Sequence, residues 1–166
     1  ESGFIKSINF PREALICSVV IKNILSHLFE AVVFFIFLFF LNIPVYGVVL
    51  YMLVLGLFAL FTYGASLFLS AVAVYVIDLG NIWQFFTTLL WFATPIFYAI
   101  DGQSRLFILN LFNPPYYFIT AARDVIVYAK IPELWILLGI VGYSVLSLAV
   151  GAVVFSRLKS RFAEMI

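Results

Sequence analysis

The chain has 166 residues, of which 66% are hydrophobic and only 10% are charged, and its formal net charge at pH 7 is +1. Soluble domains are about 45–50% apolar and about 25% charged, so a domain of this length and composition would expose a large apolar surface to water. The composition therefore predicts a protein of the lipid bilayer, and the near-zero charge excludes the basic field that binds nucleic acid.

Charge-free runs define the expected membrane spans. These runs cover residues 31–77, 79–100 and 134–156, and the stretch LNIPVYG at 41–47 marks a turn that divides the first of them. A spanning helix needs about 20 mostly apolar residues. The sequence predicts an all-α integral membrane protein, a single domain over 1–166, with four spans at about 17–41, 45–76, 80–100 and 134–156.

Lysine and arginine near the span ends predict the orientation. Four spans put both ends of the chain on one side, and both ends are basic: Lys6, Arg12 and Lys22 at the start, and Arg157, Lys159 and Arg161 at the end. Basic residues favour the cytoplasmic side. Both ends and the loop 75–81 are therefore expected in the cytoplasm, and the segments 41–47 and 101–133 are expected to face outward.

The polar residues of the first span lie on one face. Asn23, His27 and Glu30 are spaced i, i+4 and i+7, which places them on one side of a helix. Ionisable groups within a membrane nearly always face a protein interior or a wet cavity. The nearby Lys22 supports a second interpretation, in which this stretch forms a cytoplasmic collar, and the sequence leaves both open.

A proline interrupts the third span near its outer end. Pro95 would cost about 3 kcal/mol inside a helix, and aromatic residues follow it closely. The candidates for an outer gate or a sugar path in this region are Trp91, Phe97, Tyr98, Tyr116, Tyr117 and Arg123. The alternatives are an interfacial aromatic belt for the rings and an exposed outer surface for the arginine.

Two short outer helices are predicted between the last two spans. The stretch RLFILNLF at 105–112 is too short to span, and a helix over 115–129 reaches about 22 Å against a hydrocarbon core of about 30 Å. Asn113 suits a helix N-cap, and the prolines after it suit a first turn. Arg123 and Asp124 are adjacent and do not face each other on a helix, so each is expected to have another partner. A re-entrant or interfacial pair is the expected arrangement.

The last span carries small residues on one face. Ser144, Ser147 and Gly151 share this face, and small residues allow helices to approach closely in lipid. This face is predicted to pack against another span.

No pattern in the chain indicates catalysis. His27 is the only histidine, it has no HExxH around it, and no GxSxG, GxxxxGK[ST] or paired CxxC motif occurs. Cys17 is the only cysteine, so an internal disulfide and a cysteine-based metal site are excluded. The chain itself is expected to be no enzyme and to hold no metal or cofactor.

Five segments in order resemble a known family. They are INFPRE (8–13), VYVIDLGNIWQF (74–85), LWFATPIFYAID (90–101), LFNPPYYFITAARDVI (111–126) and FSRLKSRFAEMI (155–166). Together they resemble the membrane subunit of type-2 ABC exporters, closest to the branch that exports lipid-linked polysaccharide such as O antigen, capsule or teichoic acid. Ile77 precedes Asp78 where the family commonly has an arginine.

The resemblance implies a bacterial cytoplasmic (inner) membrane permease that pairs with a second copy and with two ATP-binding cassette subunits. Those subunits would hold ATP and Mg. Family members have six spans, so an amphipathic helix and two spans are expected before this chain. The outer pair of short helices would form the periplasmic gate. Residues expected at the cytoplasmic gate or ATPase contact are Phe10, Pro11, Arg12, Glu13 and Asp78.

Two other functions remain possible on the sequence alone. A type-2 exporter of a drug, an antibiotic or a lipid would have the same fold with another cargo. A membrane-embedded acyl or glycosyl transferase is a more distant alternative, and the lone His27 argues against it.

Overall fold

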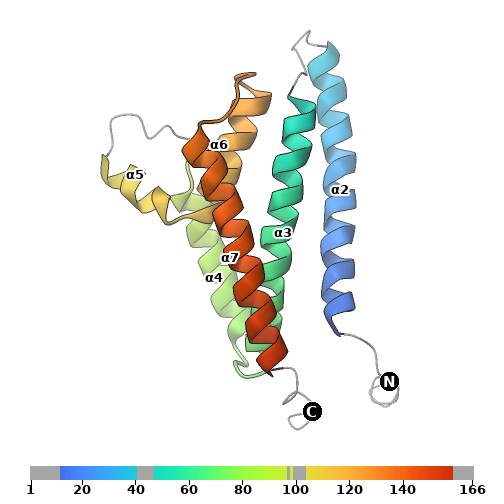
Figure 1. Cartoon of the computed structure of the whole chain (residues 1–166), viewed down its shortest axis with the longest axis vertical. Helices are drawn as coiled ribbons and strands as arrows, with labels where there is room; N and C mark the ends of the chain where they lie inside the picture. Colours follow the sequence, from blue (N-terminus) through green and yellow to red (C-terminus); the bar gives the residue numbers. More distant parts are fainter. Residues whose placement is uncertain (1–11, 41–46, 97, 99–103, 159–166) are drawn as a thin grey trace.

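The computed structural model describes residues 12–40, 47–96, 98 and 104–158, and all regular elements within these ranges are helices (Figure 1). This confirms the all-α prediction. The helices are α2 (Arg12–Phe40), α3 (Val48–Ala73), α4 (Leu79–Ala93), α5 (Ser104–Leu111), α6 (Pro114–Ile126) and α7 (Leu134–Leu158).

Three of these helices, α2, α3 and α7, are long and apolar enough to cross a membrane. The shortest, α7, has 25 residues, or about 37 Å of helix against a hydrocarbon core of about 30 Å. They correspond to the spans expected at 17–41, 45–76 and 134–156. The helix α2 begins earlier than expected, and α3 is shorter than expected and runs without interruption.

The helix expected over 80–100 ends sooner than predicted. Its counterpart α4 has 15 residues and stops at Ala93, so it reaches only about 22 Å. Thr94 adopts an extended conformation, with φ −81° and ψ 133°. A residue before proline is disfavoured in the helical region, and Pro95 has no N–H to continue the helical hydrogen bonds. The proline therefore ends α4 rather than kinking it.

The closest helix pair is α3 and α7, which lie side by side along most of their length (Figure 1). A Cβ atom added to Gly151 would overlap the carbonyl oxygen of Gly64. The Ser144 hydroxyl donates to the carbonyl of Leu57 at 2.9 Å, and Ser147 makes a matching bond one turn further along. The predicted small-residue face of the last span is confirmed as a helix contact.

Two apolar clusters stabilise this arrangement. The larger joins α3, α6 and α7, and its buried members are Val54, Tyr116, Tyr117, Phe118, Ala121, Ile136 and Ile140. The smaller lies toward the other end of α3 and α7 and contains Leu67, Ala71 and Phe155. The short helix α6 is therefore part of the core of the bundle.

The helix α2 lies at the edge of the bundle, beside α3 (Figure 1). Its buried positions form a narrow seam of Val20, Ala31 and Leu38, and most of its other side chains are exposed. The start of α2, the start of α4 and the end of α7 lie at the same end of the bundle (Figure 1).

Candidate functional site

The break after α4 is closed by side-chain hydrogen bonds. The Thr94 hydroxyl donates to the carbonyl of Leu90 at 2.7 Å and accepts a bond of 2.8 Å from Nδ2 of Asn113. Both Thr94 and Asn113 are buried. These bonds connect the end of α4 to the start of α6, although 19 residues separate the two positions.

Arg123 satisfies the carbonyl groups that follow the break. Its Nη2 donates to the carbonyl oxygens of Pro95 at 2.7 Å and of Ile96 at 3.0 Å. Neither carbonyl has a helical partner, because α4 ends at Ala93, and a buried carbonyl left unpaired costs free energy. Arg123 was expected at an outer gate or on an exposed surface; the structure places it half-buried against this turn. Its neighbour Asp124 pairs instead with Lys130 at 3.1 Å.

Asn113 occupies the N-cap position of α6 but does not cap it with its side chain. An N-cap side chain usually accepts from the second or third helical N–H, and the second residue here, Pro115, has none. The amide Nδ2 instead reaches Thr94 and also Oδ1 of Asn110, at 3.1 Å. The cap predicted from the sequence is therefore right in position, and its side chain ties together the ends of α4, α5 and α6.

Tyr116 and Tyr117, which were expected in a gate or sugar path, lie in the core at 8% and 7% exposure. Their rings pack on Trp135, with centroid distances of 6.3 and 5.8 Å. The hydroxyls of Tyr117 and Tyr143 both donate to the carbonyl of Leu111, each at 3.0 Å. Burial raises the pKa of the Tyr117 phenol, so this donor stays protonated. The two tyrosines hold α5 against α6 and α7.

Of the described rings predicted for the gate, Trp91 and Tyr98 are exposed, at 55% and 38%, and the neighbouring Phe92 is exposed by 74%. Trp91 lies on the last two turns of α4. The Tyr98 hydroxyl turns back to donate to the carbonyl of Ala93 at 2.7 Å. Tyr98 thus covers a free carbonyl at the helix end and keeps part of its ring accessible. Phe97, the other ring predicted here, lies outside the described residues.

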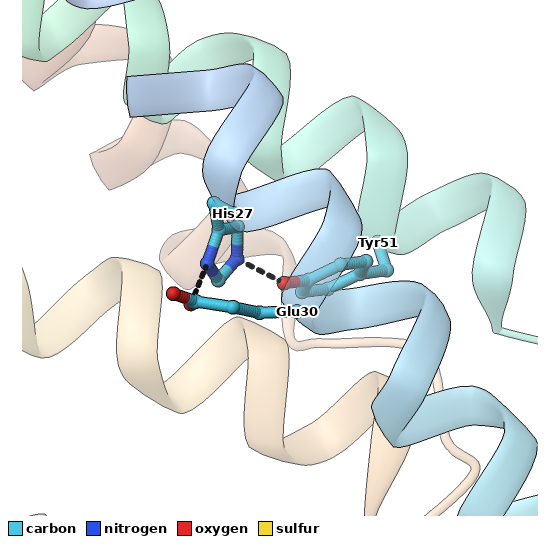
Figure 2. Close-up of polar contacts among 3 residues, drawn as sticks. All are labelled: His27, Glu30 and Tyr51. Atoms are coloured by element: carbon cyan, nitrogen blue, oxygen red, sulfur yellow. Dashed lines mark hydrogen bonds and ion pairs between the residues drawn. The ribbon is translucent and has the colours of Figure 1, made fainter. Parts of the chain in front are cut away.

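One polar residue of α2, His27, contacts α3 near the first turn of that helix. Figure 2 shows His27 between Glu30 and Tyr51: its Nε2 lies 2.6 Å from the Tyr51 hydroxyl, and its Nδ1 lies 3.6 Å from a carboxylate oxygen of Glu30. Tyr51 is only three residues from the start of α3, whereas His27 is 15 residues from the start of α2. His27 therefore contacts the neighbouring helix from near the middle of α2.

A groove of about 120 Å³ runs between α2 and α3 beside this cluster. Its walls are mainly apolar, and the third predicted polar residue, Asn23, lies at its edge. The lining residues are Val20, Asn23, Ile24, His27, Leu55, Phe58, Ala59 and Thr62. Within the described part of the chain, no group of His, Cys, Asp and Glu is arranged to hold a metal ion.

The residues expected at the cytoplasmic gate are only partly described. Phe10 and Pro11 lie outside the described residues. Arg12 opens α2, and Glu13 follows in its first turn. Asp78 is exposed and precedes α4, where its carbonyl accepts from the Ile82 N–H at 3.1 Å. The structure brings the starts of α2 and α4 to one end of the bundle (Figure 1).

Three residues that make hydrogen bonds in these clusters were not predicted from the sequence: Tyr51, Thr94 and Asn110. Thr94 had a usable signal, because a hydroxyl residue directly before a helix-ending proline can bond back to the last turn. Tyr51 had none, since nothing in a long apolar run shows which residue will lie opposite His27.

The chain matches the sequence model of one family of membrane proteins. The sequence model described as ABC-2 type transporter matches residues 5–127, which is well over half of the chain. The chain belongs to this family of transporter membrane domains and is a multi-pass membrane protein. This confirms the resemblance to type-2 ABC exporters and the expectation of a transport component rather than an enzyme.

A curated relative adds more detail. The chain is similar to the O-antigen export system permease protein RfbA of Myxococcus xanthus, with 27% identity over 164 residues. The alignment covers 96% of this chain and 63% of the relative. The chain therefore spans less than two thirds of that relative's length. No solved structure matches the chain.

Proposed function

We propose that the chain is the permease subunit of an ATP-driven exporter. The exporter moves lipid-linked polysaccharide, of the O-antigen, capsule or teichoic-acid type, across the bacterial cytoplasmic membrane. The observation that carries this proposal is the similarity to an O-antigen export permease over 96% of the chain. Membership of the ABC-2 family supports the transport class independently. An exporter of a drug, an antibiotic or a lipid would share the family and differ in cargo.

In this proposal α4 and the segment after it make the fourth crossing. The helix α4 alone reaches about 22 Å, which leaves part of a hydrocarbon core of about 30 Å to be crossed. The short helices α5 and α6 follow, as a re-entrant pair on the periplasmic side. Both ends of the chain are then cytoplasmic, in agreement with Arg12 at the start of α2 and Arg157 in the last turn of α7.

The outer gate is proposed to be the end of α4 together with α5 and α6. The exposed rings of Trp91 and Tyr98 would face the cargo, since aromatic faces suit the apolar faces of sugars. Phe97 lies between them in the sequence and belongs to the same proposal. Tyr116, Tyr117 and Arg123 would support this gate from within, because their contacts are made to the helices that carry it.

The partners follow from the same proposal. A second copy of the permease would complete the channel, and two ATP-binding cassette subunits would bind ATP and Mg, since the sequence carries no phosphate-binding loop. Their expected contact is the end of the bundle where α2 and α4 begin. Residues proposed for it are Phe10, Pro11, Arg12, Glu13 and Asp78.

The deciding experiment is the removal of this permease from its native cell. We expect completed lipid-linked polysaccharide to accumulate inside the cell and to disappear from the surface, with both restored by the wild-type gene. Normal surface polysaccharide combined with a new sensitivity to a drug would instead support the alternative cargo. Purification from the native membrane should also recover an ATP-binding subunit in equal amount.

A further inference from the structure

The turn between α3 and α4 presents a large apolar side chain to its surroundings. Ile77 is 99% exposed, more than any other large apolar side chain of the described residues. The two residues before it, Tyr75 and Val76, are 38% and 36% exposed. Single exposed apolar residues are common on protein surfaces. Three in a row form a continuous apolar surface, which we call the apolar turn (residues 75–77).

Backbone hydrogen bonds hold the apolar turn in place. The Val72 carbonyl accepts from the N–H of Tyr75 at 2.9 Å and from the N–H of Val76 at 3.1 Å. The Val76 carbonyl in turn accepts from the N–H of Leu79 at 3.2 Å. The exposure of Ile77 therefore follows from the path of the backbone between two helices, and its side chain has a defined position from which to contact a partner.

Lipid does not explain the exposure of this turn. The next residue, Asp78, is exposed, and a carboxylate is expensive in hydrocarbon. The backbone N–H groups of Ile77 and Asp78 make no hydrogen bond to the described part of the chain, and unpaired backbone groups do not face hydrocarbon. The turn therefore lies outside the hydrocarbon core, where water alone would leave its apolar side chains wet.

The position of the apolar turn indicates the class of partner. It lies at the end of the bundle where α2 begins and α7 ends (Figure 1), and Arg12 and Arg157 on those helices favour the cytoplasmic side. The partners proposed on that side are the ATP-binding cassette subunits. The turn offers them little charge, because Asp78 is the only charged residue between positions 31 and 100.

We infer that Ile77 is the apolar anchor of the contact with the ATP-binding subunit. Its side chain fills a hydrophobic pocket on that subunit. Tyr75 and Val76 pack at the edge of the pocket, and Asp78 faces a basic side chain beside it. Protein contacts concentrate their binding energy in a few central, fully buried side chains. The inference rests on the proposed ATP-driven transporter and is independent of its cargo.

The anchor is tested by binding of the purified ATP-binding subunit to the full-length permease in lipid nanodiscs. Ile77→Arg removes the apolar side chain and places a charge in the pocket, so we expect the dissociation constant to rise at least about tenfold. Ile77→Leu keeps an apolar side chain of the same size and should bind nearly as tightly as the wild type.

Ile131→Arg is the matched control. Ile131 is 79% exposed and belongs to the turn between α6 and α7, at the opposite end of the bundle (Figure 1), so this variant should bind as the wild type does. Because Ile77 and Ile131 are both exposed, both arginine variants should keep the unfolding midpoint of the wild type. A weaker affinity of Ile77→Arg alone would then report the contact and not misfolding.

Two outcomes of this titration are distinguishable. Unchanged affinity of Ile77→Arg, with normal binding by the wild type, would overturn the anchor and leave the proposed transporter intact. A wild-type permease that binds no ATP-binding subunit would overturn both.

A cross-linking experiment identifies the occupant. Ile77→Cys, in a permease whose other cysteines are replaced by serine, carries a thiol-linked benzophenone and is irradiated in the native membrane. We expect a covalent product with the mass of the permease plus the ATP-binding subunit. A product with phospholipid alone would place the turn at the membrane surface, and a product with a second permease alone would assign it to the contact between two copies. Either result would overturn the inference.

Discussion

The guanidinium of Arg123 lies 2.7 Å from the carbonyl oxygen of Pro95, across 28 positions of the sequence. Proline ends α4 and leaves carbonyl groups without helical donors. The side chain of Arg123, on α6, supplies the missing donor. The proline that ends α4 and the arginine that bonds to the carbonyl groups after it therefore lie far apart in the sequence. This bond ties the second short helix to the end of α4.

Replacing Arg123 with methionine should therefore destabilise the fold. Hydrogen bonds from a charged donor contribute about 1.5–3 kcal/mol, so we expect the free energy of unfolding to fall by about 2 kcal/mol. Arg105→Met on α5 is the control, because Arg105 is exposed, and it should change stability by less than about 0.5 kcal/mol. Denaturant unfolding in detergent micelles measures both, and equal effects would refute the role of Arg123.

Arg123 and Pro95 also show how much of the structure could be predicted from the sequence. Long apolar runs with few charges located α2, α3 and α7, because burial in lipid imposes a length and composition that any sequence must show. Pro95 indicated that something ends near it. The sequence could not predict that Arg123 would bond to the Pro95 carbonyl. No local pattern shows which side chain will contact a residue 28 positions away.

Tyr116 and Tyr117 show what the sequence could not resolve about this region. Aromatic density near an expected membrane surface favoured a gate or an interfacial belt, yet both rings lie in the core against Trp135. Burial depends on where α7 packs, and α6 was too short for its own periodicity to show a buried face. The sequence therefore located the aromatic region correctly and could not separate its exposed rings from its buried ones.

The two hydroxyls that share the Leu111 carbonyl should behave non-additively. Tyr117→Phe and Tyr143→Phe each leave that carbonyl with one donor, so each should cost about 0.5–1 kcal/mol. The double variant leaves it unsatisfied, and we expect a loss about 1 kcal/mol larger than the sum of the single losses. A double-mutant cycle on unfolding free energies measures this coupling; strict additivity would show that the two bonds are independent.

Gly151 should be intolerant of even one methyl group. A Cβ at this position would overlap the Gly64 carbonyl, whereas a Cβ at Gly142, on the same helix, would meet nothing within 4 Å. Gly151→Ala should force α3 and α7 apart and cost about 1–3 kcal/mol. Gly142→Ala should be neutral or stabilising by up to about 1 kcal/mol, because alanine favours the helix. The order of the two unfolding midpoints tests the contact, and a reversed order would contradict it.

Ala129 should accept glycine with a gain in stability. It has a positive φ of 49°, a left-handed conformation that costs an ordinary residue about 1–2 kcal/mol and costs glycine nothing. After the larger chain entropy of glycine in the unfolded state, we expect Ala129→Gly to stabilise by about 0.5–1 kcal/mol. Ala122→Gly, inside α6, should destabilise by about 1 kcal/mol. Thermal unfolding of the two variants should shift in opposite directions.

Trp91 offers the sharpest test of the proposed gate. If its exposed ring contacts the cargo at about 1 kcal/mol, Trp91→Ala should lower the export rate about fivefold. Trp83→Ala is the matched control: it removes the same side chain from the first half of α4, where Trp83 is 39% exposed. Export is followed by the arrival of labelled polysaccharide at the cell surface, at equal permease levels in the membrane.

Stability must be separated from transport in this comparison. Trp91→Ala should keep the free energy of unfolding within about 0.5 kcal/mol of the wild-type value, as expected for an exposed position. A slower export rate with unchanged stability, seen for Trp91→Ala and not for Trp83→Ala, would support a ring in the path. Equal rates for both variants would remove Trp91 from the gate. Of the other described rings predicted for it, Tyr98 would remain the exposed one, because Tyr116 and Tyr117 lie in the core.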